Sequence, residues 1–177
     1  MRFKGRAIAV GVAGFLVGGA LTGVTVWAAG SRTAATGKAV ERVAVVRSSQ
    51  IFNTTVTRYT TIPGATVRIT VPSGERALLI ARFTTQEDCN VGDGNPSGKC
   101  MARIISNTRE MAPASGGSAI DTVAAGNPAG VRSAALDRSL GPVGPGTYRI
   151  KVQVKVTNAL MIVELTDWHL TVERVRV

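Results

Sequence analysis

The sequence predicts an all-β protein, an antiparallel β-sandwich preceded by an apolar N-terminal helix. Three observations predict it: apolar and polar residues alternate with period two in several stretches, Gly and Pro clusters separate these stretches, and the first thirty residues hold an uncharged apolar run. The alternation indicates strands with one buried and one wet face. Frequent turn residues between strands are typical of jelly-roll and immunoglobulin-like sandwiches, and both topologies remain open.

The N-terminal element covers residues 1–30, where Arg2, Lys4 and Arg6 precede the apolar run Ala7–Ala29. A cleaved signal peptide and a retained membrane anchor are both open: the run is long enough to span a bilayer, yet it is rich in glycine and ends in small residues. The basic residues keep the N-terminus in the cytoplasm in either case. We therefore expect an exported protein, secreted or anchored to the outer face of the cytoplasmic membrane, that touches the membrane only through this segment.

Two further segments follow the leader. Residues 31–40 are mostly small and polar and are expected to form a linker. Residues 41–177 are enough for one domain with its own hydrophobic core, so we expect a single β-sandwich domain there. The predicted strands within it, in chain order, are 66–71, 77–83, 101–105, 120–123 and 148–156.

Each strand has its own pattern. In 66–71 three branched apolar residues alternate with Thr and Arg, and 77–83 is apolar on both faces apart from Arg82, as expected of a central strand. The patterns of 101–105 and 120–123 are weaker. In 148–156 the alternation is the cleanest of the chain. The turns expected at strand ends are Pro63-Gly64, Pro72–Gly74, Gly116-Gly117 and Gly141–Gly146.

Cys89 and Cys100 are the two cysteines of the chain, and ten residues rich in Gly, Asn, Asp and Pro separate them. In an oxidising compartment an isolated pair at this spacing predicts a disulfide that closes a loop between two strands. The spacing is not that of a C-x-x-C redox centre, and no neighbouring histidines complete a zinc site.

Oxygen-bearing side chains in and beside this loop (Asp88, Asn90, Asp93 and Asn95) raise the alternative of a calcium site. Their spacing does not match an EF-hand, and Asp and Asn are common in glycine-rich turns for conformational reasons. We therefore expect no metal and no cofactor.

Catalytic motifs are missing from the sequence. His169 is the single histidine, and no G-x-S-x-G or H-E-x-x-H pattern occurs. In a strand, Asp167 and His169 would share a wet face while Trp168 faces the core, so the alternative function is a secreted hydrolase with a site near Asp167 and His169. Nothing marks a nucleophile, and the acids available for a carboxylate pair are scattered, so we predict that the protein is not an enzyme. Those acids are Glu87, Asp88, Glu164 and Asp167.

A basic stripe is predicted on the last clean strand, where Arg149, Lys151 and Lys155 alternate with apolar residues. The formal net charge is +10, and since three of those charges come from the leader, the rest of the chain carries +7. Such a surface attracts anionic wall or surface polymers through charge, without reading a nucleic-acid sequence. The competing interpretation is that exposed basic residues only keep a strand soluble. Arg58, Arg68, Arg174 and Arg176 are candidates to extend the stripe.

Several spaced segments resemble a set of exported β-sandwich proteins of actinobacteria that have no established function. The segments are 71–83, 89–104, 144–153 and 167–173, and the resemblance runs from about Ile62 to Val177. It implies the fold and the exported location, and it implies no activity. In those relatives two consecutive aspartates often precede the tryptophan, whereas in this chain Thr166 takes the place of the first aspartate.

The sequence thus predicts an exported or surface-anchored, non-enzymatic binding or structural module. Its expected ligand is an anionic cell-surface polymer, and nothing in the sequence indicates an oligomeric state.

Overall fold

The structure is a computed structural model that describes residues 37–91, 97–123 and 130–177. The predicted leader, most of the linker, and Asp93 and Asn95 of the calcium alternative lie outside these residues. In the described part of the chain, no helix has the length and apolar character needed to cross a membrane.

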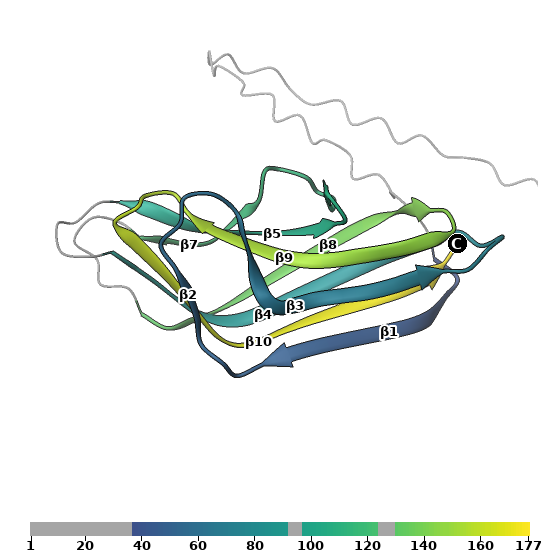
Figure 1. The fold of residues 1–177 in the computed structure, drawn as a ribbon, viewed down its shortest axis with the longest axis horizontal. Coiled ribbons are helices and arrows are strands. Elements are labelled where there is room, and N and C mark those ends of the chain that lie inside the picture. Colours follow the sequence, from purple (N-terminus) through teal and green to yellow (C-terminus); the bar gives the residue numbers. More distant parts are fainter. Residues whose placement is uncertain (1–36, 92–96, 124–129) are drawn as a thin grey trace, which may run out of the picture. The chain divides into compact units, whose positions relative to one another are not determined.

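In the described residues, ten antiparallel strands form two sheets that pack face to face on one core, and Figure 1 shows their course. Sheet A has the order β1-β10-β4-β8, with β2 also paired to β10, and sheet B has the order β3-β9-β5-β6, with β7 also paired to β5. The strands of sheet A are β1 (Ala39–Ser48), β2 (Phe52–Thr54), β4 (Ala77–Val91), β8 (Arg132–Val143) and β10 (Met161–Arg176). Those of sheet B are β3 (Thr60–Val71), β5 (Gly98–Ser106), β6 (Arg109–Glu110), β7 (Ser118–Val123) and β9 (Gly146–Val156).

The core fills the space between the sheets with the inward residues of alternating strands. In β10 the buried positions include Val163, Leu165, Leu170 and Val172, and in β9 they are Ile150, Val152, Val154 and Val156. Phe83 of β4 packs beside Trp168 of β10, with ring centroids 6.5 Å apart. The all-β architecture with two packed antiparallel sheets is therefore confirmed.

One of the predicted turns, Pro63-Gly64, is wrong because it lies inside a strand, and another, Gly141–Gly146, is correct only at residues 144–145, between β8 and β9. Pro63 and Gly64 are part of β3, at an irregularity where the register with β9 shifts between Thr61 and Thr66. A bulge on an edge strand tolerates proline, whose missing N–H is not needed for pairing there. Residues 141–143 continue β8, which is an edge strand of sheet A and so also tolerates Pro142, and the turn into β9 follows them.

Strand β8 was not predicted at all, because its alternation is broken by an inward arginine. Leu136 and Arg138 are both buried, and the guanidinium of Arg138 donates to the Asp137 carbonyl at 2.8 Å and to the Ser118 hydroxyl. A charged residue at a core position removes the period-two signal that identifies a strand.

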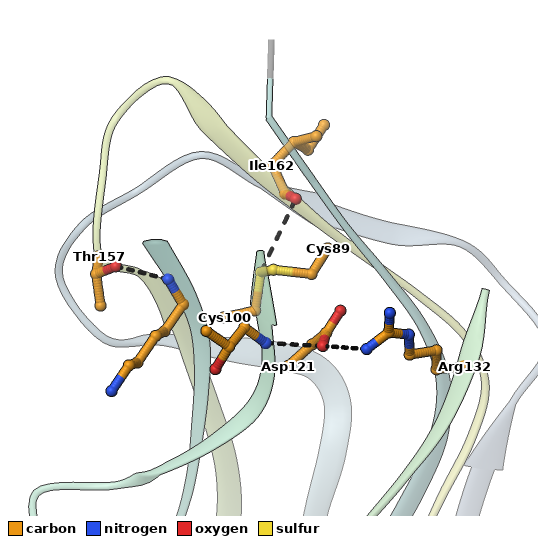
Figure 2. Close-up of a disulfide and its surroundings, with 8 residues drawn as sticks. Cys89, Cys100, Asp121, Arg132, Thr157 and Ile162 are labelled. Atoms are coloured by element: carbon orange, nitrogen blue, oxygen red, sulfur yellow. Dashed lines mark hydrogen bonds and ion pairs between the residues drawn. A yellow bond between two sulfur atoms is a disulfide. The ribbon is translucent and has the colours of Figure 1, made fainter. Parts of the chain in front are cut away.

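The predicted disulfide is confirmed, and it joins the two sheets. Cys89 lies near the end of β4 in sheet A and Cys100 near the start of β5 in sheet B, with Cα atoms 6.0 Å apart and both residues fully buried. Figure 2 shows the bond beside the Asp121–Arg132 ion pair. Since Arg132 belongs to β8 and Asp121 to β7, covalent and ionic links connect the sheets at the same end.

A buried carboxyl group lies next to these links. Glu87 of β4 is 1% exposed, and neither of its carboxyl oxygens has a hydrogen-bond partner among the described residues. Burial raises the pKa of Glu87 to about 7, and the Asp121 carboxylate adds to this rise while Arg132 opposes it. Glu87 is thus an ionisable group on the inward side of β4, where all other buried residues except Thr85 are apolar.

Candidate functional site

The outer surface of sheet B carries the predicted basic residues. Along β9, Arg149, Lys151, Gln153 and Lys155 alternate with four fully buried aliphatic residues, so they share the outer side of the sheet. β9 is flanked by β3 and β5. The outward side chains of β9 therefore lie beside those of both neighbouring strands.

The neighbouring strands add cations and no acids. Arg68 of β3 lies directly opposite Arg149, and Arg103 of β5 lies directly opposite Gln153. We use the name cationic face for the basic residues of these three strands: Arg68, Lys99, Arg103, Arg149, Lys151 and Lys155. β3, β5 and β9 contain no Asp or Glu, and within the described residues none of the six cations forms an ion pair.

Two of the residues expected to extend the stripe lie elsewhere. Arg174 and Arg176 belong to β10 of sheet A, and both form ion pairs of 3.2 Å with Glu41. Arg58 is exposed in the segment before β3. Of the four candidates, Arg68 is the one that the pairing with β9 places on the cationic face.

Tyr59 covers one end of this face. The guanidinium carbon of Arg103 lies 3.9 Å from the centre of the Tyr59 ring, and Nζ of Lys155 lies 4.8 Å from it. The Tyr59 hydroxyl donates to the Gly116 carbonyl at 2.5 Å. Burial raises the pKa of Tyr59, although the nearby Arg103 acts in the opposite direction. The ring therefore holds two cations in place through cation–π contacts.

A hydrogen-bond chain fixes the same region across three strands. Nε of Arg103 donates to Gln153 at 2.9 Å, and the Gln153 amide lies 3.3 Å from the Thr61 hydroxyl. Arg103 and Tyr59 were missed by sequence reasoning. The position of Arg103 between the apolar residues Ala102 and Ile104 could have indicated that its side chain points outward. Tyr59 reaches the face from a loop, and no local pattern indicates its position there.

The position of Tyr59 predicts unequal effects of alanine at two adjacent glycines. Gly116 and Gly117 both have positive φ, 75° and 101°. A Cβ at Gly116 would meet open space, but one at Gly117 would overlap the Tyr59 hydroxyl. We expect Gly117→Ala to cost about 2 kcal/mol of unfolding free energy and Gly116→Ala about 1 kcal/mol, measured by urea denaturation. Equal losses would contradict the close contact between Tyr59 and Gly117.

Asp167 and His169 lie on the opposite side of the molecule, on the outer surface of sheet A. The register of β10 with β4 shifts between Thr166 and His169, and Asp167 has a φ of 45° at this bulge. Oγ1 of Thr84 lies 3.0 Å from Nδ1 and 2.9 Å from Nε2 of His169. Trp168 is buried, as its side of the strand predicted. The two side chains of the hydrolase alternative thus share the outer side but form no ion pair with each other in the described structure.

Two open hollows flank this pair. One of about 530 Å³ lies toward β1 and is lined by Arg47, Ser48 and Gln50, and the other, of about 300 Å³, lies toward β8 and is lined by Thr84, Gln86 and Ser133. Their linings mix polar and apolar groups. The Thr84 hydroxyl is in hydrogen-bond contact with the His169 ring, so a hydroxyl and an imidazole do meet here. In the described part of the chain no carboxylate is ion-paired with that ring, so the acid of a complete triad is not in place.

The remaining carboxylate candidates do not meet in a cleft either. Asp88 of β4 lies opposite Glu164 of β10 in register. Glu87 points the other way, into the core. Among the described residues, no group of three or more His, Cys, Asp or Glu side chains is arranged to hold a metal ion.

No protein-family model matches the chain, and the comparison with curated proteins also gave no match. Among solved structures, the chain is similar to the dimeric latent form of PorU from Porphyromonas gingivalis, with 11% sequence identity and a TM-score of 0.34. The similarity covers 80% of this chain and 14% of that one. At this level it assigns neither a family nor an activity.

Proposed function

We propose that the protein is an exported or surface-anchored, non-enzymatic binding module that engages anionic surface polymers through the cationic face. The observation that supports this proposal is the charge segregation of sheet B: six cations and no carboxylate on three adjacent strands, with none of the cations in an ion pair in the described structure. Cations kept only for solubility need no such exclusion of acids. A surface of one sign raises the local concentration of an oppositely charged polymer and its association rate.

An intersheet disulfide supports the exported location, because such bonds persist mainly in oxidising compartments. We further infer that the sandwich is a jelly roll. With the short strands β2 and β6 set aside, eight strands remain, and they pair first with last, second with seventh, third with sixth and fourth with fifth. This is the pairing of a long hairpin folded over into two sheets. The strand order therefore favours the jelly roll over the immunoglobulin-like alternative.

The proposal predicts a site-specific loss of polyanion binding. The variant Arg149→Gln, Lys151→Gln, Lys155→Gln should bind heparin at least about tenfold more weakly at low salt, and the slope of log K against log salt should fall by about 2, because fewer counterions are released. Isothermal titration across a salt series measures both. Its thermal stability should stay within about 0.5 kcal/mol of the wild type, because the changes lie on a wet surface.

A matched control removes the same charge elsewhere. Arg42, Arg47 and Arg76 are exposed, lie outside β3, β5 and β9, and form no ion pair in the described structure. Their triple glutamine variant has the same net charge as the first one. Equal binding by the two variants would show that net charge, and not the cationic face, drives the association.

A further inference from the structure

The cations on sheet B form a regular series along β9. Successive outward positions of this strand are 149, 151, 153 and 155. Arg149 and Lys151 occupy the first two and Lys155 the last. The third is Gln153, but Arg103 lies directly across from it on β5 and is hydrogen-bonded to it. One cation therefore lies at or directly beside each of four consecutive outward positions, and Arg68 adds a second cation beside the first position.

The spacing of this series is set by the backbone. Two residues of an antiparallel strand contain six backbone bonds and advance about 6.8 Å. Measured in the direction of β9, the four cations span about 20 Å, and Arg103 is displaced sideways by one strand spacing, about 4.8 Å, because it lies on β5. A ligand that contacts all of them must be extended and must carry an anion at the same interval.

A phosphodiester polymer has this interval. In a chain with three carbons between successive phosphates, the path from one phosphorus to the next runs P–O–C–C–C–O–P, which is also six single bonds, so its extended repeat is about 7 Å. Each repeat carries one negative charge with oxygens that accept hydrogen bonds from Lys and Arg. Polyphosphate places its charges at less than half this distance.

We propose that the polymer bound by the cationic face is a linear polyol phosphate chain that lies along β9, with one phosphate at each of the four positions. This inference rests on the proposed function and names its ligand class. Recognition involves the phosphodiester backbone and not the groups attached to it. Tyr59 is the aromatic residue at this face, and its ring is already occupied by Arg103 and Lys155, so within the described structure no free ring stacks on a nucleobase.

The experiment measures binding of the full chain, kept in mild detergent, to synthetic glycerol phosphate oligomers of two to eight phosphates. We expect affinity to rise several-fold with each phosphate up to four and to change little beyond that. A glycerol phosphate hexamer should bind at least about tenfold more tightly than polyphosphate of equal charge. Lys151→Gln should lower the salt slope for the hexamer by about 0.7, while Arg76→Gln leaves it unchanged.

The outcomes separate this inference from the proposed function. Equal affinity for glycerol phosphate and polyphosphate at matched charge would overturn the ligand class while the polyanion-binding function stands. Failure of every polyanion to bind would overturn both. A thymidine oligonucleotide with the same number of phosphates should bind about as well as the glycerol phosphate oligomer. Much tighter binding of the oligonucleotide would show contacts to bases and would overturn recognition through the backbone.

Discussion

The free energy of unfolding should fall by about 3 kcal/mol as the pH rises from 4 to 8, and Glu87→Gln should abolish this fall. Burial raises the pKa of Glu87 from its ordinary value of 4.5 to about 7, so the folded state holds more protons than the unfolded chain between these values. Stability from the protonated carboxyl is then fully present below pH 4.5 and is lost as the pH rises through 7, and the shift converts to about 3 kcal/mol. Urea denaturation across this pH range measures the profile.

Glutamine imitates the neutral carboxyl without ionising, so the variant should be more stable than the wild type at pH 8 and nearly equal to it at pH 4. The matched control is Glu164→Gln on β10, whose carboxylate is partly exposed on the outer surface of sheet A. The control should leave the difference between pH 4 and pH 8 almost intact. A Glu87→Gln variant that keeps the full wild-type pH dependence would refute the assignment to this residue.

Loss of the Cys89–Cys100 disulfide should cost about 3 kcal/mol in unfolding free energy and lower the midpoint of thermal unfolding by about 10 °C. The chain-entropy model gives this value for a closed loop with a sequence separation of 11. Differential scanning calorimetry of the variant Cys89→Ala, Cys100→Ala measures the effect.

Reduction of the wild-type protein is the control for the substitutions themselves. Both cysteines are fully buried, so alanine also removes packing, and the variant should be somewhat less stable than the reduced wild type. A variant that unfolds at the same temperature as the oxidised wild type would contradict the expectation.

Much of the sandwich was predictable because several of its strands show a clear alternation of apolar and polar residues in their own sequence. The outward order of Arg149, Lys151 and Lys155 follows from a period-two pattern, and that pattern also predicts the buried partners. The disulfide followed from two cysteines and a turn-rich loop. Such predictions depend only on neighbours in the chain.

The remaining features depend on residues far apart in the chain. Arg103 joins the series on β9 only through a register that no single strand determines, and Tyr59 reaches it from a loop through a contact to Gly116. β8 was not predicted because Arg138 occupies a core position, where its guanidinium donates a hydrogen bond to Ser118 of the other sheet. The predicted strand stopped at Phe83, although β4 runs to Val91, because the polar residues from Thr84 to Asp88 end the apolar run.

The exclusion of acids from three strands of sheet B has a consequence for how the molecule approaches a charged surface. In the described structure, the strands of sheet A carry seven acidic residues and seven arginines, whereas those of sheet B carry seven cations and two acids, Glu110 of β6 and Asp121 of β7. Positive charge is therefore concentrated on one layer, which gives the sandwich an electric dipole across its thickness. Within a Debye length of about 8 Å at physiological ionic strength, a polyanionic surface exerts a torque on this dipole. The domain should thus arrive with sheet B first, leaving the hollows beside His169 turned toward the solvent.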